Sequence, residues 1–187
     1  MKRTEPAAVR DKERTRRTIL EAAERLFSER GANVSLADIA VGAGVTKGGL
    51  MHHFPSREAL VVGVIEHVLT RVWDEVHAHV DLSENRPGKF TRGYVRALTG
   101  DSEYVTRILN PTGLIATLGP SPEVDELYRV DAQRWTVAFA ADGLPPARVH
   151  AVRYAAEGLA VAVGSPYLTG DELALTRAEL LALTEVP

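Results

Sequence analysis

Few side chains in this chain are suited to catalyse a reaction or to hold a metal ion. The sequence contains six histidines and no cysteine, which excludes disulfides, thiolate metal sites and cysteine nucleophiles. His77 and His79 are two residues apart and do not share one face of a helix. No HExxH, GxSxG or phosphate-binding loop occurs in the sequence. We therefore expect no catalytic residue, no metal and no cofactor, and an all-α enzyme remains only as an alternative.

The richest set of hydrogen-bonding residues follows Ser35, in the segment SLADIAVGAGVTKGGLMHHFPSR. Ser35 is a predicted helix N-cap with Asp38 as its capping-box partner, although Glu or Gln is more usual there. Gly44 suits a left-handed turn that ends the first helix, and Thr46 suits the cap of a second helix. The spacing predicts a helix-turn-helix over about residues 36–55, a layout that places its second helix in the major groove of DNA.

The second predicted helix carries two adjacent glycines, Gly48 and Gly49. Each costs about 1 kcal/mol relative to alanine in a helix interior. A helix that only packs in a bundle core, which is the alternative interpretation, gains nothing from them. A helix whose backbone must approach DNA closely does gain, so the glycines favour a recognition helix. Leu50 and Phe54 lie four residues apart and are expected to face the core.

The other residues of this helix carry the groups expected to contact DNA. Lys47 is the best candidate to donate to guanine, with a lysine that touches only phosphate as the alternative. Met51 offers an apolar contact, for instance to a thymine methyl group, and His52 offers a hydrogen bond to phosphate or base. Hydroxyl groups, helix N-terminal N–H groups and cationic side chains suit the DNA backbone. The predicted DNA-binding residues are Ser35, Thr46, Lys47, Gly48, Gly49, Met51, His52, His53 and Arg57.

Residues from Thr15 to about Trp73 resemble the N-terminal domain of the TetR family of bacterial transcriptional regulators. The resemblance rests on the strings TRRTILEAAERLFSERG and SLADIAVGAGVTKGGLMHHFPSREAL and on the apolar helix after them, about a third of the chain. It implies a three-helix DNA-binding head on an all-helical ligand-binding and dimerisation body. It further implies a homodimer on a palindromic operator, usually as a repressor that a small molecule releases.

The recognition helix departs from many family members at two positions. Many members carry Thr at the position of Gly49 and Tyr at the position of Met51, and both of those residues often touch DNA. The chain is closer to members that read Gly-Gly-Leu-Leu-Tyr-His-Phe, with Met51 and His52 at the variable places. The positions of His53 and Arg57 usually grip phosphate in the family.

Charge is divided unequally along the chain. Residues 1–60 carry a net charge of +3 and residues 61–187 a net charge of −6. A basic head on an acidic body suits DNA contact at one end only. We expect a flexible basic arm over residues 1–11, which lies along the DNA or remains a solvated tail. After it we expect a helix-turn-helix domain over residues 12–60, followed by a helical ligand-binding and dimerisation domain over residues 61–187.

The expected fold class is all-α with about nine helices, because no stretch alternates with period two for long enough to form a strand. The first helix is predicted over about residues 12–30, with Ile19, Ala22, Ala23, Leu26 and Phe27 facing inward. A link helix is predicted to continue from residue 57 to about 80. Glycine and proline punctuation then predicts helices at about 89–99, 101–118, 122–141, 146–164 and 170–184.

A predicted kink at Asn110 and Pro111 is the feature of the body that most favours a ligand pocket. Proline interrupts the helix and frees backbone carbonyls beside apolar residues, which is the composition of a small-ligand pocket. Arg107 or Arg134 is a candidate anchor for an anionic ligand, and ordinary core packing is the alternative for each aromatic residue. The predicted ligand-binding residues are Trp73, Tyr94, Tyr104, Arg107, Asn110, Leu114, Arg134, Trp135 and Phe139.

The last two predicted helices, about 146–164 and 170–184, carry small and apolar residues over much of their surface. Such helices pack across the two-fold axis of a homodimer, with closure of the monomer core as the alternative. No apolar run reaches the length of a membrane span, and the charged N-terminus lacks the apolar stretch of a signal peptide. We therefore expect a cytoplasmic protein with no membrane partner.

These features together predict a ligand-responsive, sequence-specific DNA-binding transcriptional regulator. Its expected partners are a palindromic double-stranded DNA operator, a second copy of the chain and an unidentified small-molecule effector. We expect a repressor that the effector releases. The alternative is a transcriptional activator or a DNA-binding protein without a ligand, because the sign of regulation depends on where the operator lies.

Overall fold

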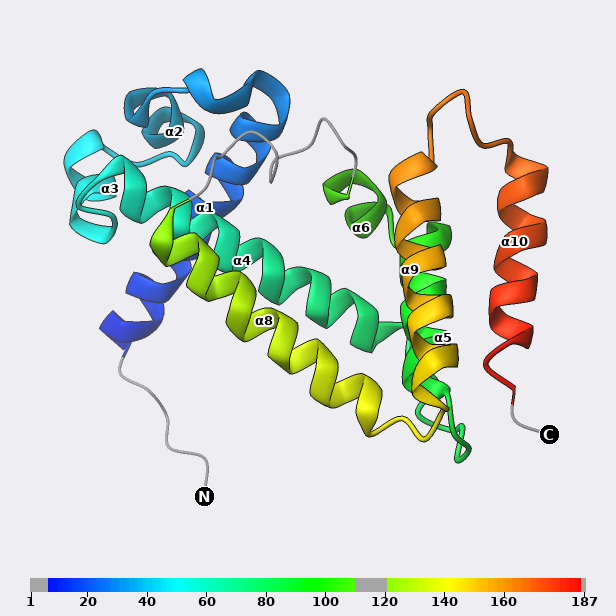
Figure 1. Cartoon of the computed structure of the whole chain (residues 1–187). Helices are drawn as coiled ribbons and strands as arrows, with labels where there is room; N and C mark the ends of the chain where they lie inside the picture. Colours follow the sequence, from blue (N-terminus) through cyan, green and yellow to red (C-terminus); the bar gives the residue numbers. More distant parts are fainter. Residues whose placement is uncertain (1–6, 110–120, 186–187) are drawn as a thin grey trace. The chain divides into compact units, whose positions relative to one another are not determined.

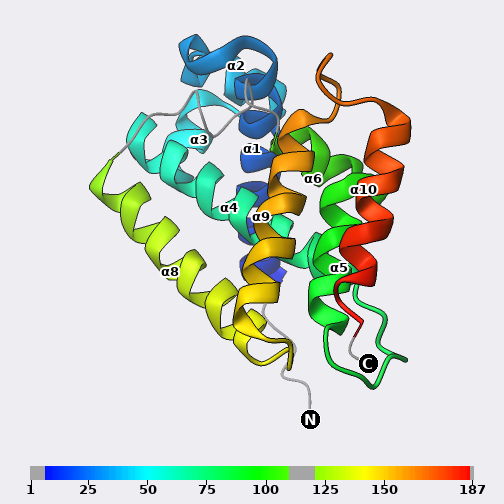
Figure 2. The ribbon, with the colours of Figure 1, turned by 45° about the vertical axis from the view of Figure 1, so that its right-hand side comes forward.

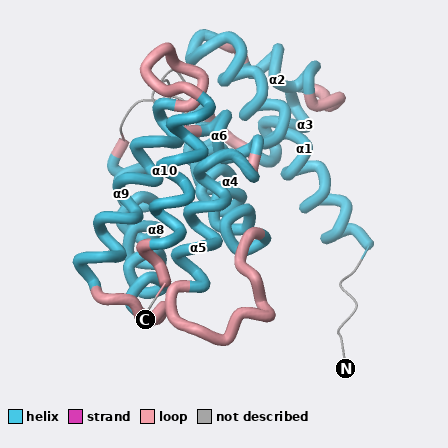
Figure 3. The backbone as a smooth tube through the Cα atoms, turned by 90° about the vertical axis from the view of Figure 1, so that its right-hand side faces the viewer, coloured by secondary structure: helices cyan, strands magenta, loops and turns pink. Residues whose placement is uncertain are grey.

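The computed structural model describes residues 7–109 and 121–185, which form helices joined by loops (Figure 1). Within these two ranges no segment forms a strand (Figure 3), and the all-α prediction is confirmed. No helix in the described ranges is long and apolar enough to cross a membrane. The chain divides into two compact units. The described residues of the first unit, the head, are 7–68 and 121–124, and those of the second unit, the body, are 69–109 and 125–185.

The head contains α1 (Ala7–Arg30), a 3-10 turn (Gly31–Asn33), α2 (Leu36–Gly42), α3 (Lys47–His53) and the first part of α4 (Arg57–Ala78). Helix α1 begins earlier than predicted, so residues 7–11 are helical. The reason is local, because most of these residues are good helix formers. Asp11 also forms an ion pair with Arg14 at 3.0 Å, one turn further along the helix.

The core of the head is built from the predicted inner faces of its helices. Each residue in this core is at most 5 % exposed: Ile19, Ala22, Ala23, Leu26, Phe27, Ile39, Ala40, Leu50 and Phe54. Helix α4 approaches the core closely at Gly63, where a Cβ atom would lie 2.8 Å from Cε1 of Phe54. Glycine is therefore required by packing at this point of α4.

The body contains the rest of α4, then α5 (Lys89–Arg96), a π-helical segment (Ala97–Asp101), α6 (Glu103–Ile108), most of α8 (Pro122–Ala140), α9 (Pro146–Ala162) and α10 (Gly170–Ala182). Helices α5, α9 and α10 lie side by side (Figure 2). The ends of α8, α9 and α10 agree closely with the predicted helices. Helix α6 begins at Glu103, because Ser102 caps it by accepting from the N–H of Val105 at 3.2 Å. The predicted kink after it lies outside the described residues.

Helix α5 is the most deeply buried element of the body. Asp142 caps its start, and the carboxylate accepts from the N–H groups of Phe90 and Thr91 at 2.9 and 2.8 Å. Arg92, which is 1 % exposed, donates from Nε to Glu84 at 2.6 Å. Buried polar and charged groups are costly without partners. Glu84 lies in the loop before α5 and Asp142 lies in the loop after α8, so these bonds hold both loops against α5.

Candidate nucleic-acid interface and body pocket

Helix α2, the first helix of the motif, begins with the predicted capping box. The N–H of Asp38 donates to Oγ of Ser35 at 3.1 Å. Oδ2 of Asp38 accepts from the N–H and the hydroxyl of Ser35 at 3.2 and 2.6 Å. The hydrogen bonds from Ser35 lower the pKa of the exposed Asp38 carboxyl. Asp38 therefore replaces the more usual Glu, with its negative charge at the favourable end of the helix.

Gly44 forms the turn between α2 and α3 in the predicted left-handed conformation, with a φ of 67°. Its N–H donates to the carbonyl of Val41, and the N–H of Val45 donates to the carbonyl of Ala40, both at 3.0 Å. This pairing is a Schellman motif, which ends a helix with a residue at positive φ. Because a Cβ atom would be strained at Gly44, this residue sets the direction in which α3 leaves the turn.

Helix α3 presents one buried and one open side. Thr46 caps it as predicted, since Oγ1 accepts from the N–H of Gly49 at 3.0 Å. Leu50 is fully buried and anchors the helix to the head. Lys47, Gly48 and His52 are exposed, and Gly49, Met51 and His53 are half-buried. Apart from the neighbouring residues and the backbone of α3 itself, no atom of the described residues lies within 4 Å of the position that a Cβ on Gly48 would take. Packing in the head therefore does not require glycine there.

His53 lies at the end of α3, between the open side and the core. Its Nδ1 atom is buried without a hydrogen-bond partner among the described residues. Burial, followed by the positive charges of His52, Lys12 and Arg16, lowers the pKa of His53. The imidazole ring of His52 lies edge-on to it at 5.8 Å. The fold therefore favours the neutral form of His53.

Arg57 has an intramolecular role that the sequence analysis missed. Its Nη1 donates to the carbonyl of Val34 at 2.5 Å, and its guanidinium lies 5.4 Å from the ring centre of Phe27. The side chain thus ties the start of α4 to the segment before α2.

Four of the predicted ligand-binding aromatics come together in the body. The ring centre of Trp135 lies 4.8 Å from that of Trp73, 5.4 Å from that of Tyr94 and 6.2 Å from that of Phe139. Phe90, which the sequence analysis missed, lies 5.2 Å from Phe139; its spacing of four residues from Tyr94 was the available signal. Phe90, Tyr94, Trp135 and Phe139 are at most 9 % exposed, so these rings form much of the core of the body.

Arg134, a predicted anion anchor, is already paired in the body. Its guanidinium lies 3.9 Å from the ring centre of Trp73, and its Nη2 lies 3.3 Å from Oδ1 of Asp131. Asp131 also accepts from Nε1 of Trp135 at 2.8 Å. Burial raises the pKa of Asp131, and the hydrogen bond from Trp135 and the charge of Arg134 oppose this effect. Arg134 therefore already has partners within the aromatic core, the ring of Trp73 and the carboxylate of Asp131.

Four other predicted ligand-binding residues remain, namely Tyr104, Arg107, Asn110 and Leu114. Tyr104 is buried under Arg71, whose guanidinium lies 3.8 Å from the ring centre, and Arg107 lies 5.4 Å from the same ring. Arg107 itself is exposed. Asn110 and Leu114 lie outside the described residues.

Two family profiles match successive parts of the chain. The profile described as "Bacterial regulatory proteins, tetR family" matches residues 19–64, and the profile described as "Tetracyclin repressor-like, C-terminal domain" matches residues 88–185. The chain belongs to the TetR family. It is a DNA-binding transcriptional regulator with a helix-turn-helix head, and membership implies operator binding and dimerisation.

Relatives of known name agree with this membership. The HTH-type transcriptional repressor Rv3405c of Mycobacterium tuberculosis is 33 % identical over 184 residues, which are 92 % of this chain and 93 % of that protein. The HTH-type transcriptional regulator TtgR of Pseudomonas putida is 43 % identical over 67 residues, 35 % of this chain and 30 % of that protein. These matches place the chain among regulators.

Solved structures show the same fold. A transcriptional regulator from Rhodococcus sp. Rha1 matches with a TM-score of 0.70 and 20 % identity, over 92 % of this chain and 99 % of that chain. The multidrug binding protein EbrR, complexed with imidazole, matches with a TM-score of 0.62 and 23 % identity, over 93 % of this chain and 92 % of that chain.

TetR-family proteins are regulators and not enzymes, and the predicted absence of catalysis agrees with this membership. Among the residues that the structure describes, no three His, Cys, Asp or Glu side chains are grouped to hold a metal ion.

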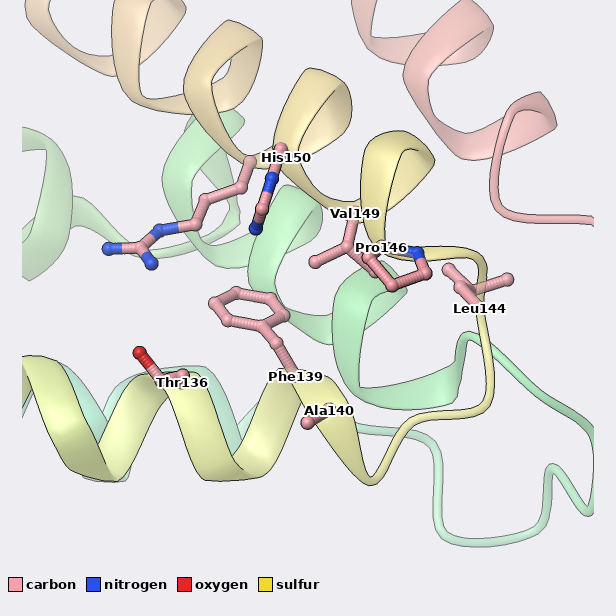
Figure 4. A pocket seen from close by; sticks show the side chains of 8 residues that line it. Thr136, Phe139, Ala140, Leu144, Pro146, Val149 and His150 are labelled. Carbon is pink, nitrogen blue, oxygen red and sulfur yellow. The ribbon is translucent and has the colours of Figure 1, made fainter.

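The body of this TetR-family chain also contains a pocket of about 290 Å³ between α8 and α9 (Figure 4). Phe139 from α8 and His150 from α9 point toward one another across it. Leu144 and Val149 extend the apolar wall, and Thr136 and Arg153 add polar groups. Of the predicted ligand-binding residues, Phe139 lines this pocket.

A hydrogen-bonded chain connects this pocket to the aromatic core. Oε1 of Glu157 accepts from the hydroxyl of Tyr94 at 2.7 Å and from Nε of Arg153 at 2.8 Å. Burial, followed by the charge of Glu157, raises the pKa of Tyr94 well above its ordinary value. Tyr94 is therefore a neutral donor that holds Glu157 in place beside Arg153.

Proposed function

We propose that this TetR-family regulator is a repressor that binds a palindromic operator as a homodimer and is released by a small molecule. The observation that carries the proposal is the open side of α3, where Lys47 and His52 are exposed and Gly48 is not required by packing. Repression is supported by the similarity to Rv3405c, a repressor. Release by a small molecule is supported by EbrR, a multidrug binding protein of the same fold with imidazole bound.

In this proposal the open side of α3 faces the edges of the bases. Lys47 donates to a guanine, and Met51 makes an apolar contact such as one with a thymine methyl group. Gly48 and Gly49 allow the helix backbone to approach the groove more closely than alanine would. The two recognition helices of a dimer enter successive major grooves about 34–36 Å apart.

A second set of residues is proposed to hold the DNA backbone. Ser35 and Thr46 stand at the starts of α2 and α3, where hydroxyl and N–H groups suit phosphate. His52 and His53 lie at the other end of α3. Arg57 at the start of α4 adds a cationic side chain to this set.

The homodimer is proposed to form through α9 and α10. Exposed small and apolar residues recur every three or four positions along α9: Ala147, Ala151, Tyr154, Gly158 and Val161. Helix α10 exposes Leu175, which is 74 % accessible, and then Ala178 and Ala182 at the following turns. Apolar stripes of this kind on two neighbouring helices suit packing across a two-fold axis.

The effector site is proposed to lie in the body. The aromatic wall formed by Trp73, Tyr94, Trp135 and Phe139 is the part of the predicted site that the structure brings together. Tyr104, Arg107, Asn110, Leu114 and Arg134 stay candidates of this proposal. An effector shifts the regulator only by its difference in affinity for two states. Helix α4 contributes residues to both units, so it is the proposed mechanical link.

Selection of duplexes from a random library by the purified protein tests the proposal. An enriched inverted repeat is expected, and binding that depends on salt but enriches no motif would overturn the assigned base contacts. Reporter expression from the natural promoters that carry the enriched repeat, compared with and without the protein, then separates a repressor from an activator by the direction of the change.

The proposed interface is tested by the mass of the protein in solution. Tyr154→Glu, which places a charge in the exposed stripe of α9, is expected to shift a dimer toward monomer and to weaken binding to the inverted repeat. Val137→Glu is the matched control, because Val137 is 63 % exposed on α8 and Tyr154 is 62 % exposed on α9. A dimer that both variants leave unchanged would place the interface elsewhere.

A further inference from the structure

The pocket between α8 and α9 has the composition of a binding site for a small planar molecule (Figure 4). Its volume of about 290 Å³ is close to the lower end of the range for small-molecule sites, about 300–1,000 Å³. Phe139, Leu144 and Val149 are at most 7 % exposed, so the apolar wall is held by the core behind it. The face of an aromatic ring suits a second flat ring.

The polar lining of this pocket favours a negative ligand. Arg153 and His150 line it, and no Asp or Glu is found among the described lining residues. The neighbouring carboxylates are already paired, Glu157 of α9 with Arg153 at 2.8 Å and Asp131 of α8 with Arg134 at 3.3 Å. A cationic ligand would therefore meet Arg153 without a free carboxylate to balance it.

Arg153 is the lining side chain whose chemistry suits an incoming carboxylate. Its guanidinium lies 5.3 Å from the ring centre of Phe139, and its side chain is 24 % exposed. Oε1 of Glu157 accepts from Nε of Arg153, one of five N–H donors, and from the hydroxyl of Tyr94. The planar fork of a guanidinium matches the two oxygens of a carboxylate.

We propose that this pocket binds a small aromatic carboxylate, with its ring against Phe139 and Val149 and its carboxylate on Arg153. His150 supplies a second donor from the same helix. Among the described residues, the site shares Phe139 alone with the predicted ligand-binding residues. The inference deepens the proposed function by naming an effector class, and it rests on that function only for the effect on DNA.

Calorimetry on the full-length protein with benzoate, benzyl alcohol and benzylamine tests the ligand class. The three probes share one ring and differ in charge. Benzoate is expected to bind at least about tenfold more tightly than the neutral or cationic probe, as a charge-assisted hydrogen bond in a half-buried site requires. Equal binding of the three, or tighter binding of benzylamine, would overturn the assignment.

Two substitutions with opposite expected effects on benzoate affinity test whether the carboxylate binds at Arg153. Arg153→Met is expected to weaken benzoate binding by about 10- to 100-fold. Glu157→Gln keeps an acceptor for Tyr94 but releases Arg153 from its internal carboxylate, so it is expected to tighten binding. Arg129→Met and Glu126→Gln are matched controls, because this pair also forms a salt bridge within one helix, at 2.6 Å, outside the pocket.

A third variant keeps the test valid if Arg153→Met does not fold. Ala140→Phe fills the space beside Phe139 without removing a charge, because Ala140 is an exposed lining residue, and it is expected to abolish benzoate binding. Parental affinity in Ala140→Phe would overturn the proposed location.

Operator binding, measured in parallel, separates this inference from the proposed function. Loss of operator affinity on adding benzoate supports both. Benzoate binding that leaves operator affinity unchanged supports the pocket and contradicts release by this class of ligand. Specific operator binding without benzoate binding overturns the pocket alone.

Discussion

Lys47 and His52, predicted to bind DNA, lie in an environment opposite to that of Tyr94 and Trp135, predicted to bind an effector. In the head, Lys47 and His52 are exposed on a helix whose other side is anchored by Leu50. In the body, Tyr94 and Trp135 are at most 7 % exposed. An exposed side chain on an anchored helix is available to an external partner, whereas a buried aromatic side chain stabilises the fold first. Residue type thus indicates a site more directly on a surface motif than inside a core.

The largest expected effect is on the aromatic core of the body. Trp135→Ala removes a buried ring that contacts Trp73 and Tyr94 and donates to Asp131. The free energy of unfolding is expected to fall by about 3–5 kcal/mol, measured by urea denaturation. Val130→Ala is the control, because Val130 on α8 is 51 % exposed. Its free energy of unfolding is expected to change by no more than about 0.5 kcal/mol. A Trp135→Ala protein of parental stability that lost its effector response would place the residue in a ligand site instead.

Lys47→Ala is expected to weaken DNA binding and leave stability nearly unchanged, the reverse of Trp135→Ala. Because Lys47 is exposed at the start of α3, the free energy of unfolding should change by less than about 0.5 kcal/mol. Affinity for the selected operator should fall by about 1–3 kcal/mol, with relaxed preference at one base pair. Fluorescence anisotropy over a set of operator variants measures both, with Lys89→Ala in the body as the control. A uniform loss over all sequences would reduce Lys47 to a phosphate contact.

Gly48→Ala sharpens the comparison because stability and function should move in opposite directions. Open space surrounds the new Cβ, and alanine is favoured over glycine in a helix by up to about 1 kcal/mol. The thermal midpoint should rise while operator affinity falls, since the backbone of α3 is held further from DNA. A variant that gained both stability and affinity would remove the reason for glycine at this position.

The smallest expected effect is the pH dependence that His53 contributes to stability. Burial lowers the pKa of His53 in the folded chain, and the unfolded chain titrates near about 6.5. The unfolded chain therefore takes up a proton first as the pH falls, so this contribution to stability is complete above about pH 6.5 and decreases below it. Urea midpoints between pH 7.5 and 5.5 should fall less steeply in His53→Gln than in the parent. His150→Gln, at an exposed position of α9 in the body, is the control.

The caps and turns of the head were predictable because each acts within a few residues of the chain. Ser35 with Asp38, Gly44 and Thr46 all have the conformations and hydrogen bonds expected from their types. The start of α1 was predicted too late because the charged N-terminal stretch up to Asp11 was taken as a tail, although most of residues 7–11 are good helix formers. The residues proposed to contact DNA remain predictions.

The sequence by itself determined the all-α class, most helix ends and the helix-turn-helix, because hydrophobic period, caps and glycine turns are local properties. Only the tertiary structure decided which distant residues meet. Arg57 bonds to Val34, 23 residues away, and Asp142 caps α5 from 52 residues beyond Phe90. The pocket that brings Phe139 of α8 near Arg153 of α9 depends in the same way on how the helices pack. Such contacts arise from the packing of whole helices, and no local signal in the chain specifies which side chains will face each other.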